Sequence, residues 1–193
     1  MIELPDFARI GSATPMFVDA GFTQRGIGSL SRIDRKGSRY KMACSYGPFY
    51  PENGRVMVSK LIAGKSEGVR IPFPLLVSQG SPGSPLVSGS HITGKTLNIK
   101  GLTPGYVCKD GFWLSLVKSG RHFLHNVKTG GTASGSGTLS VVLNEMLRDS
   151  FVNNSVVHLA EPMVEGLVDG SEWQWSLSVD RVTPIQFTIE EVR

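Results

Sequence analysis

Apolar and polar residues alternate at period two through most of this 193-residue chain. Such alternation is typical of half-buried β-strands, and the Gly, Pro, Ser and Thr residues between the alternating segments are typical of turns. The sequence predicts strands at residues 15–18, 29–34, 39–46, 69–77, 85–88, 96–99, 112–117, 121–127, 138–143, 156–160, 163–167, 173–179 and 184–192. Turns are predicted at residues 35–38 and 118–120, each with a glycine that can take a positive φ.

One segment departs from this alternation. Val58, Leu61 and Ile62 lie at i, i+3 and i+4 spacing, which places them on one face of a helix. A Pro-Glu pair precedes them, as is typical of a helix start, and Gly64 follows them as a stop signal. We therefore predict one helix at about residues 52–63. The strands and this helix together predict an all-β fold, a β-sandwich or barrel with one short helix.

The length suits one compact domain, which we predict for residues 1–193 with a sub-boundary near residues 78–90. A flexible loop rich in Gly, Ser and Thr is predicted at residues 129–137, and a second turn of helix at residues 144–149. No run approaches the roughly 18 apolar residues of a membrane span, and the first residues lack the pattern of a signal peptide. We therefore predict no membrane span.

Residues 89–96 read GSHITGKT, which matches the G-x-x-x-x-G-K-[ST] pattern of phosphate-binding loops in nucleotide hydrolases. A working loop of that kind is followed by a helix whose first N–H groups bind the anion. After Lys95, however, polar and apolar residues alternate, and the sequence GLTPG at residues 101–105 would stop a helix. We therefore predict a strand from Thr96 and interpret residues 89–96 as a turn.

Basic residues are concentrated in the first half of the chain. Residues 1–85 hold 11 Lys and Arg against 6 Asp and Glu, whereas residues 86–193 hold 9 against 10. Most of the excess lies between Arg25 and Lys41, where only Asp34 opposes the cations. Such a cluster can bind nucleic acid or meet an acidic protein surface, although charged strand edges produce the same pattern. The candidate residues for contact with a partner or a lumen are Arg32, Arg35, Lys36 and Arg39.

Few residues offer metal or redox chemistry. Cys44 and Cys108 have no CxxC or CxxH neighbour, so we predict two half-buried strand cysteines in a reducing compartment. His122 and His125 are three residues apart on a predicted strand, so their side chains should point to opposite faces and not share one metal ion. No metal site and no cofactor are predicted.

Catalytic groups are equally sparse. Glu161 and Glu165 would lie about 13 Å apart along an extended segment, too far for the paired carboxylates of a glycosidase. Glu190 and Glu191 would face opposite ways, and the chain has no G-x-S-x-G nucleophile elbow. A Ser or Cys triad assembled from distant positions stays open at the level of sequence. We predict no enzymatic activity and name no catalytic residue.

Two tryptophans share one face of the strand predicted at residues 173–179. Trp173 and Trp175 could bind a base or a sugar there. Core packing or a subunit interface is the more frequent use of such a pair, and we favour it.

Several short motifs follow one another in a defined order. They are RKGSRY at 35–40, the helix, VRIPFP at 69–74, GSPGS at 80–84, GKTL at 94–97, GLTPG at 101–105, KDG at 109–111, FLH at 123–125, and the segments 143–148 and 156–162. This order resembles that of the distal tail proteins of long-tailed bacteriophages, the ring proteins between tail tube and tail tip. The resemblance covers most of the chain.

The resemblance implies a structural, non-enzymatic protein that is made in the host cytoplasm and resides in the virion at the tail tip. Its implied partners are further copies of itself in a hexameric ring, the tail tube, and the tail-tip or hub proteins of the baseplate. DNA would pass through the lumen, and the basic hairpin at residues 35–40 would contact a neighbour or line that lumen. A tail-tube or tail-terminator subunit is a related role.

Two other hypotheses belong to different classes. The first is a nucleic-acid-binding β-barrel module, in which the basic cluster tracks phosphates and exposed aromatic residues stack on bases. The second is a nucleotide hydrolase that uses residues 89–96.

Overall fold

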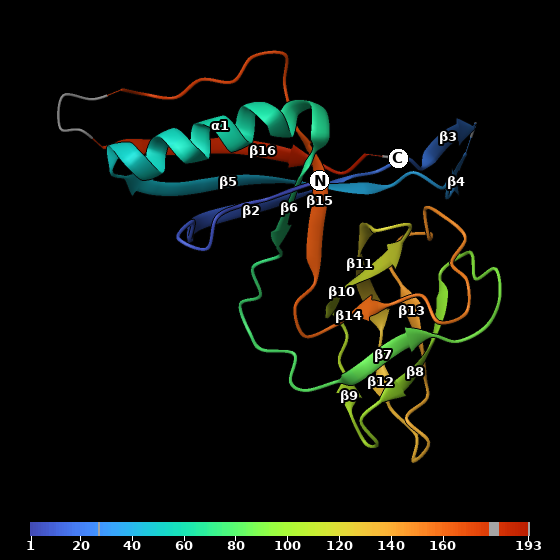
Figure 1. The fold of residues 1–193 in the computed structure, drawn as a ribbon. Helices are drawn as coiled ribbons and strands as arrows, with labels where there is room; N and C mark the ends of the chain where they lie inside the picture. Colours follow the sequence, from blue (N-terminus) through green and yellow to red (C-terminus); the bar gives the residue numbers. More distant parts are fainter. Residues whose placement is uncertain (27, 178–181, 193) are drawn as a thin grey trace. The chain divides into compact units, whose positions relative to one another are not determined.

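The computed structural model describes residues 1–26, 28–177 and 182–192 of the chain (Figure 1). Contacts among these residues divide the chain into two compact units. The sheet unit comprises Met1–Val18, Tyr40–Ile71 and Val164–Val192, and the barrel unit comprises Asp19–Arg39 and Pro72–Met163. Strands predominate in both units, and one helix occurs within the described residues. The predicted all-β class with one helix is therefore confirmed, whereas the single domain predicted for residues 1–193 stays a prediction.

A six-stranded sheet forms the sheet unit. Its strands, in spatial order, are β1 (Ile2–Glu3), β6 (Val69–Pro72), β15 (Met163–Val168), β16 (Thr183–Glu190), β5 (Arg39–Phe49) and β2 (Ile10–Val18). The alternation predicted for β5 is present, because Tyr40, Met42, Cys44 and Tyr46 are buried while the residues between them are half-buried. β5 pairs antiparallel with β16, although the two strands are far apart in the sequence.

The helix α1 (Pro51–Glu67) extends beyond its predicted end at Gly64. A Cβ atom at Gly64 would lie 2.4 Å from Cγ2 of Val69, so the glycine lets α1 pack closely against β6 instead of stopping the helix. α1 ends at Glu67, and Gly68, which caps it, has a φ of 79° that favours glycine. Its buried residues are Gly54, Met57, Leu61 and Gly64. Ile62, which was expected on the same face as Leu61, is exposed. Within the described residues, no helix is long and apolar enough to cross a membrane.

A second six-stranded sheet closes almost completely into a barrel in the barrel unit. Its strands, in spatial order, are β14 (Val157–His158), β10 (Trp113–Lys118), β11 (Arg121–Thr129), β13 (Leu139–Leu143), β8 (Thr96–Leu102) and β7 (Gly83–Val87). A bridge between Leu86 and Val156 brings β7 back beside the start of β14. Inside lies one apolar core that includes Leu97, Leu116 and Phe151. Closure removes most of the exposed strand edges.

The hairpin of β10 and β11 follows the sequence prediction. Lys118 and Arg121 are paired, and the two turn residues Ser119 and Gly120 have φ values of 50° and 75°. Two positive φ values identify the type I′ turn that suits the twist of a hairpin. The predicted turn at residues 118–120 is therefore confirmed.

The barrel unit also holds two small two-stranded sheets. One pairs β9 (Val107–Cys108) with β12 (Gly131–Thr132), and the other pairs β3 (Phe22–Gly26) with β4 (Ser29–Ile33). The second sheet overturns the basic hairpin expected at residues 35–40, because β4 pairs with β3 and not with β5. β5 is already paired on both sides, with β16 and β2. A turn does occur at residues 36–37.

Other predicted elements differ in extent. The strand expected at residues 69–77 ends at Pro72, since prolines at 72 and 74 have no N–H for a strand ladder. A strand was expected at residues 173–179. Residues 173–177 do not form a strand, and residues 178–179 lie outside the described residues. Residues 144–149 form bends and not a helical turn. The strands that were not predicted are β1, β3, β9 and β12, all of five residues or fewer.

Candidate interaction surfaces

The four basic residues chosen as contact candidates have different surroundings. Arg32 on β4 is held between two carboxylates, with Nη1 2.9 Å from Asp19 Oδ2 and Nε 3.1 Å from Asp34 Oδ1. The Arg35 guanidinium lies 5.2 Å from the centroid of the Phe22 ring. Lys36 lies in the turn at residues 36–37. Arg39 is half-buried and is the first residue of β5. The four candidate residues therefore differ in their local contacts and in their burial.

The carboxylates around Arg32 are themselves stabilised in their charged form. The hydrogen bond from Arg32 is the largest influence that lowers the pKa of Asp19. For Asp34, the hydrogen bond from Lys95 comes first and that from Arg32 second, and both lower its pKa. Arg32 is thus neutralised locally, which favours a structural role for this residue over one in binding phosphates.

Lys95 belongs to the GSHITGKT segment, and the contacts of this residue indicate what the segment does in the fold. Its ammonium group is bonded to Asp34. The carbonyls of Gly94 and Lys95 accept hydrogen bonds of 2.7 Å from the N–H groups of Leu147 and Leu143. β8 begins at the next residue, so the prediction of a strand from Thr96 is confirmed. The helix N-terminus that a phosphate-binding loop requires does not follow this segment.

The hairpin of β3 and β4, which we call the β3–β4 arm, is exposed at every strand residue. Phe22 and Ile33 are directly paired, as are Arg25 and Leu30, so the two pairs lie on opposite faces of the arm. The exposed fractions are 46% for Phe22, 68% for Leu30 and 50% for Ile33. Apolar side chains therefore face solvent on both sides of a two-stranded hairpin, a structure that is only marginally stable by itself.

The sheet unit has an exposed edge of its own. β2 is the outermost strand of its sheet within the described residues, and its nine residues pair only with β5. Met16 and Phe17 on this strand are exposed, at 40% and 51%. An outer strand of this length offers backbone N–H and C=O groups to another chain, although Pro15 removes one donor.

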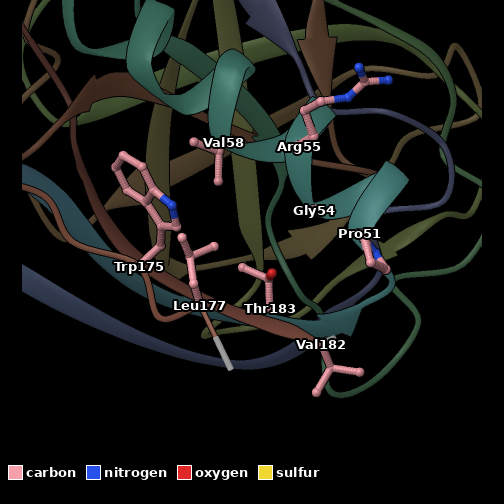
Figure 2. Close-up of a pocket in the computed structure, with 8 residues that line it drawn as sticks. All are labelled: Pro51, Gly54, Arg55, Val58, Trp175, Leu177, Val182 and Thr183. Atoms are coloured by element: carbon pink, nitrogen blue, oxygen red, sulfur yellow. The ribbon is translucent and has the colours of Figure 1, made fainter. Parts of the chain in front are cut away.

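A mainly apolar pocket of about 420 Å³ lies between α1 and the segments on either side of the undescribed residues 178–181. It is lined by Pro51, Gly54, Arg55, Val58, Trp175, Leu177, Val182 and Thr183 (Figure 2). The Trp175 and Trp173 rings lie 5.1 Å apart, and Trp173 Nε1 donates a 2.7 Å hydrogen bond to the Gln186 carbonyl. The two tryptophans are thus close together, but without the strand that was expected to hold them.

The histidines of β11 face opposite sides, as predicted. His125 is buried, and its Nδ1 lies 2.7 Å from Glu145 Oε1. His122 Nδ1 lies 3.4 Å from the Ser115 hydroxyl, and its ring is 5.0 Å from the ring of His158. Within the described residues, no group of three or more His, Cys, Asp or Glu side chains is placed to hold a metal ion.

Three of the four glutamates considered in the sequence have separate partners. Glu165 is buried, with Oε2 2.8 Å from Arg70 Nε. Glu190 lies 2.6 Å from Lys41 Nζ. Glu191 is buried and accepts a 2.8 Å hydrogen bond from the backbone N–H of Tyr40. Each of these carboxylates therefore binds a different group of the sheet unit.

Both cysteines lie on strands, as predicted, and they are fully rather than half buried. Burial raises the pKa of the Cys44 thiol to about 12 and that of the Cys108 thiol to about 11. Both thiols therefore stay protonated and weakly nucleophilic at neutral pH.

A grouping of side chains that the sequence did not reveal surrounds Lys36. The cavity there has a volume of about 510 Å³ and lies within the barrel unit. Lys118, Arg121 and Arg148 line it together with Lys36. These residues come from the 36–37 turn, the β10–β11 hairpin and the loop after β13, so no local motif could have linked them.

In comparisons with known proteins, no protein-family model and no curated protein sequence matches this chain.

Proposed function

We propose that this protein is a structural subunit of a ring at the tail tip of a long-tailed bacteriophage, where it connects the tail tube to the tip. The observation that carries the proposal is the β3–β4 arm, whose apolar side chains are exposed on both faces. The order of motifs along the chain resembles that of distal tail proteins, and this resemblance is the reason for proposing a tail-tip ring in particular.

The physical basis is burial of the arm and of the β2 edge against neighbouring subunits. Fully burying an apolar side chain of the size of Leu, Ile or Phe contributes about 1.5–3 kcal/mol. Leu30 and Ile33 lie on opposite faces of the arm, so a neighbour that encloses the arm would bury both. In a closed ring the same contact is repeated at every interface between neighbouring subunits. A modest free energy per contact therefore adds up over the whole ring.

Arg32 has a defined place in this scheme. Its bonds to Asp19 and Asp34 tie β4 to the residues that flank the arm, and thereby hold the arm in position. In this scheme Arg35, Lys36 and Arg39 would contact a neighbouring subunit or line the lumen through which DNA passes.

The experiment measures the mass of the full-length protein in solution by light scattering coupled to size exclusion, with and without candidate tail-tube and hub proteins. We expect the wild-type chain to form a ring, a hexamer by the resemblance, and Leu30→Glu to shift it to the monomer. Leu76→Glu is the matched control, because Leu76 is a fully exposed leucine outside the arm. A wild-type chain that stays monomeric under all conditions, or a Leu30→Glu variant that assembles normally, would reject the proposal.

Nucleic-acid binding is the second candidate function, and the basic cavity of the barrel unit is the observation that favours it. Binding of a single strand requires a series of cations that contact successive phosphates. Arg32 and Lys41 are poor candidates for such contacts, because each forms ion pairs with two carboxylates. A steep loss of DNA affinity between low and moderate salt would support this function, and no binding at low salt would remove it.

A further inference from the structure

We infer that the sheet unit carries a groove that binds a neutral oligosaccharide of pyranose sugars. The groove has a volume of about 1210 Å³ and lies between strands β2, β5 and β16 and the segment 172–176 that follows β15. We call it the tryptophan groove, after Trp173 and Trp175 in that segment. All of its lining residues belong to the sheet unit, and the inference does not depend on ring assembly.

The floor of the groove is the face of the sheet that points away from α1. The helix packs closely on Val168 of β15, and Val168 is paired with Ile189 of β16. Because side chains alternate along a strand, Gln186 and Thr188 of β16 project from the opposite face. Both residues line the groove, together with the two residues of β5 to which they are paired.

The aromatic wall of the groove is held in place by its own contacts. Trp173 Nε1 donates a 2.7 Å hydrogen bond to the Gln186 carbonyl, and the Trp175 ring lies 5.1 Å from the Trp173 ring at an interplanar angle of 34°. Trp175 is 39% exposed and also borders the apolar pocket beside α1 (Figure 2), so core packing does not account for it. A tryptophan fixed in this way offers a ligand a preorganised apolar surface.

The polar side chains of the groove suit a ligand that is rich in hydroxyl groups. Exposed hydroxyl and amide side chains line it, namely those of Ser12, Thr14, Gln174, Ser176 and Gln186. Each of these groups can both donate and accept hydrogen bonds. A sugar hydroxyl has the same two capacities, so the groove and a saccharide are complementary in their hydrogen bonding.

The charges of the groove argue against an anionic ligand. Its described lining contains two carboxylates, Asp169 and Glu172, and neither Lys nor Arg. Asp169 is bonded to Lys41 at 3.0 Å, whereas Glu172 is exposed beside the two tryptophans. Carboxylates repel phosphate groups, which disfavours nucleic acid as the ligand. A neutral sugar meets no such repulsion, and its hydroxyls can donate hydrogen bonds to the carboxylate oxygens.

The size of the groove favours a chain of sugars over a single ring. Pockets for small molecules have volumes of about 300–1,000 Å³, and the tryptophan groove is larger. In glucose and N-acetylglucosamine, the C–H groups of the pyranose ring form an apolar face, and the hydroxyls lie at its edge. Such a face can pack on Trp175 while the hydroxyls reach the polar side chains of the strands.

The test is calorimetric titration of the full-length protein with cellohexaose, maltohexaose and chitohexaose. Hexalysine serves as the probe for a cationic peptide, the other ligand that the two carboxylates would suit. We expect saturable binding of at least one hexasaccharide, with an affinity that is the same at low and moderate salt because the ligand is neutral. Hexalysine should bind weakly or not at all.

Variants of the groove separate recognition from structural damage. Trp175→Ala should weaken hexasaccharide binding at least about tenfold, whereas Trp175→Phe, which keeps an aromatic ring, should retain most of it. Gln186→Ala should weaken binding several-fold through the loss of a hydrogen bond. Gln24→Ala is the matched control, because Gln24 is an exposed glutamine outside the groove. Circular dichroism checks that each variant is folded.

Three results would overturn the inference. They are the absence of saturable binding for all three hexasaccharides, binding of hexalysine alone, and a folded Trp175→Ala variant that binds sugar as well as the wild type does. The mass of the same samples reports ring assembly separately. A protein that assembles without binding sugar therefore rejects the groove alone, and a monomer that binds sugar rejects the ring alone.

Discussion

The sheet unit and the barrel unit differ in whether the outer strands of their sheets are paired. In the barrel unit, β7 returns to the start of β14 and the six-stranded sheet is nearly closed around its own core. In the sheet unit, α1 packs on an open sheet, and the nine-residue strand β2 stays at an edge. A closed sheet satisfies its own backbone groups, whereas an open sheet offers them to a partner.

The two units also differ in how their chain is arranged. The barrel strands β7 to β14 come from one continuous stretch within Pro72–Met163. The sheet unit is assembled from three separate segments, and its longest strand, β5, pairs with β16. Forming contacts between distant segments costs more chain entropy than forming local ones. The comparison indicates a self-contained barrel unit and a sheet unit that depends more on distant contacts.

The largest effect is expected from Phe151→Ala in the barrel core. Phe151 is fully buried and packs edge-to-face on Phe123 at 5.6 Å, so its truncation should cost about 3–5 kcal/mol in the free energy of unfolding. Urea unfolding is followed by fluorescence and by circular dichroism. One transition that shifts as a whole would support the single domain predicted for residues 1–193. Two transitions, of which only one shifts, would show that the units unfold separately.

A smaller effect is expected from Gly64→Ala in the sheet unit. A Cβ at this position would meet Val69 Cγ2 at 2.4 Å and Val168 Cγ2 at 3.3 Å, so α1 must move away from β6 and β15. Overpacking of this kind costs about 1–3 kcal/mol, despite the better helix propensity of alanine. Gly135→Ala in the barrel unit is the control, since nothing lies within 4 Å of its Cβ position. Equal stability of the two variants would contradict the close packing of α1.

The last effect is the alkaline pH dependence from the two buried thiols, one in each unit. Their folded pKa values, about 12 for Cys44 and about 11 for Cys108, exceed the value near 8.5 of an unfolded chain. The stabilisation is therefore fully present below about pH 8.5 and is lost as the pH rises toward the folded values. Unfolding titrations between pH 7 and 10 should show this decline, and Cys44→Ala and Cys108→Ala should each remove part of it. A flat profile in the wild-type protein would contradict the burial of both thiols.

Several features of the molecule were decided by the sequence itself. The period-two alternation of β5 and β8, the turn at residues 118–120, and the strand after Lys95 could all be predicted. These features depend on neighbouring residues, through side-chain alternation and the φ values that a glycine permits. The all-β class and the single helix follow from the same local signals.

Only the tertiary structure decided which elements meet. β4 pairs with β3 and not with β5, and Gly64 lies inside α1, where it packs closely on Val69, instead of ending the helix. Arg32 is neutralised by Asp19, and Lys36 joins cations from two distant loops. Pairing, packing and charge balance are interactions between residues that are remote in the sequence, and the pattern around any one of them carries no information about its partner.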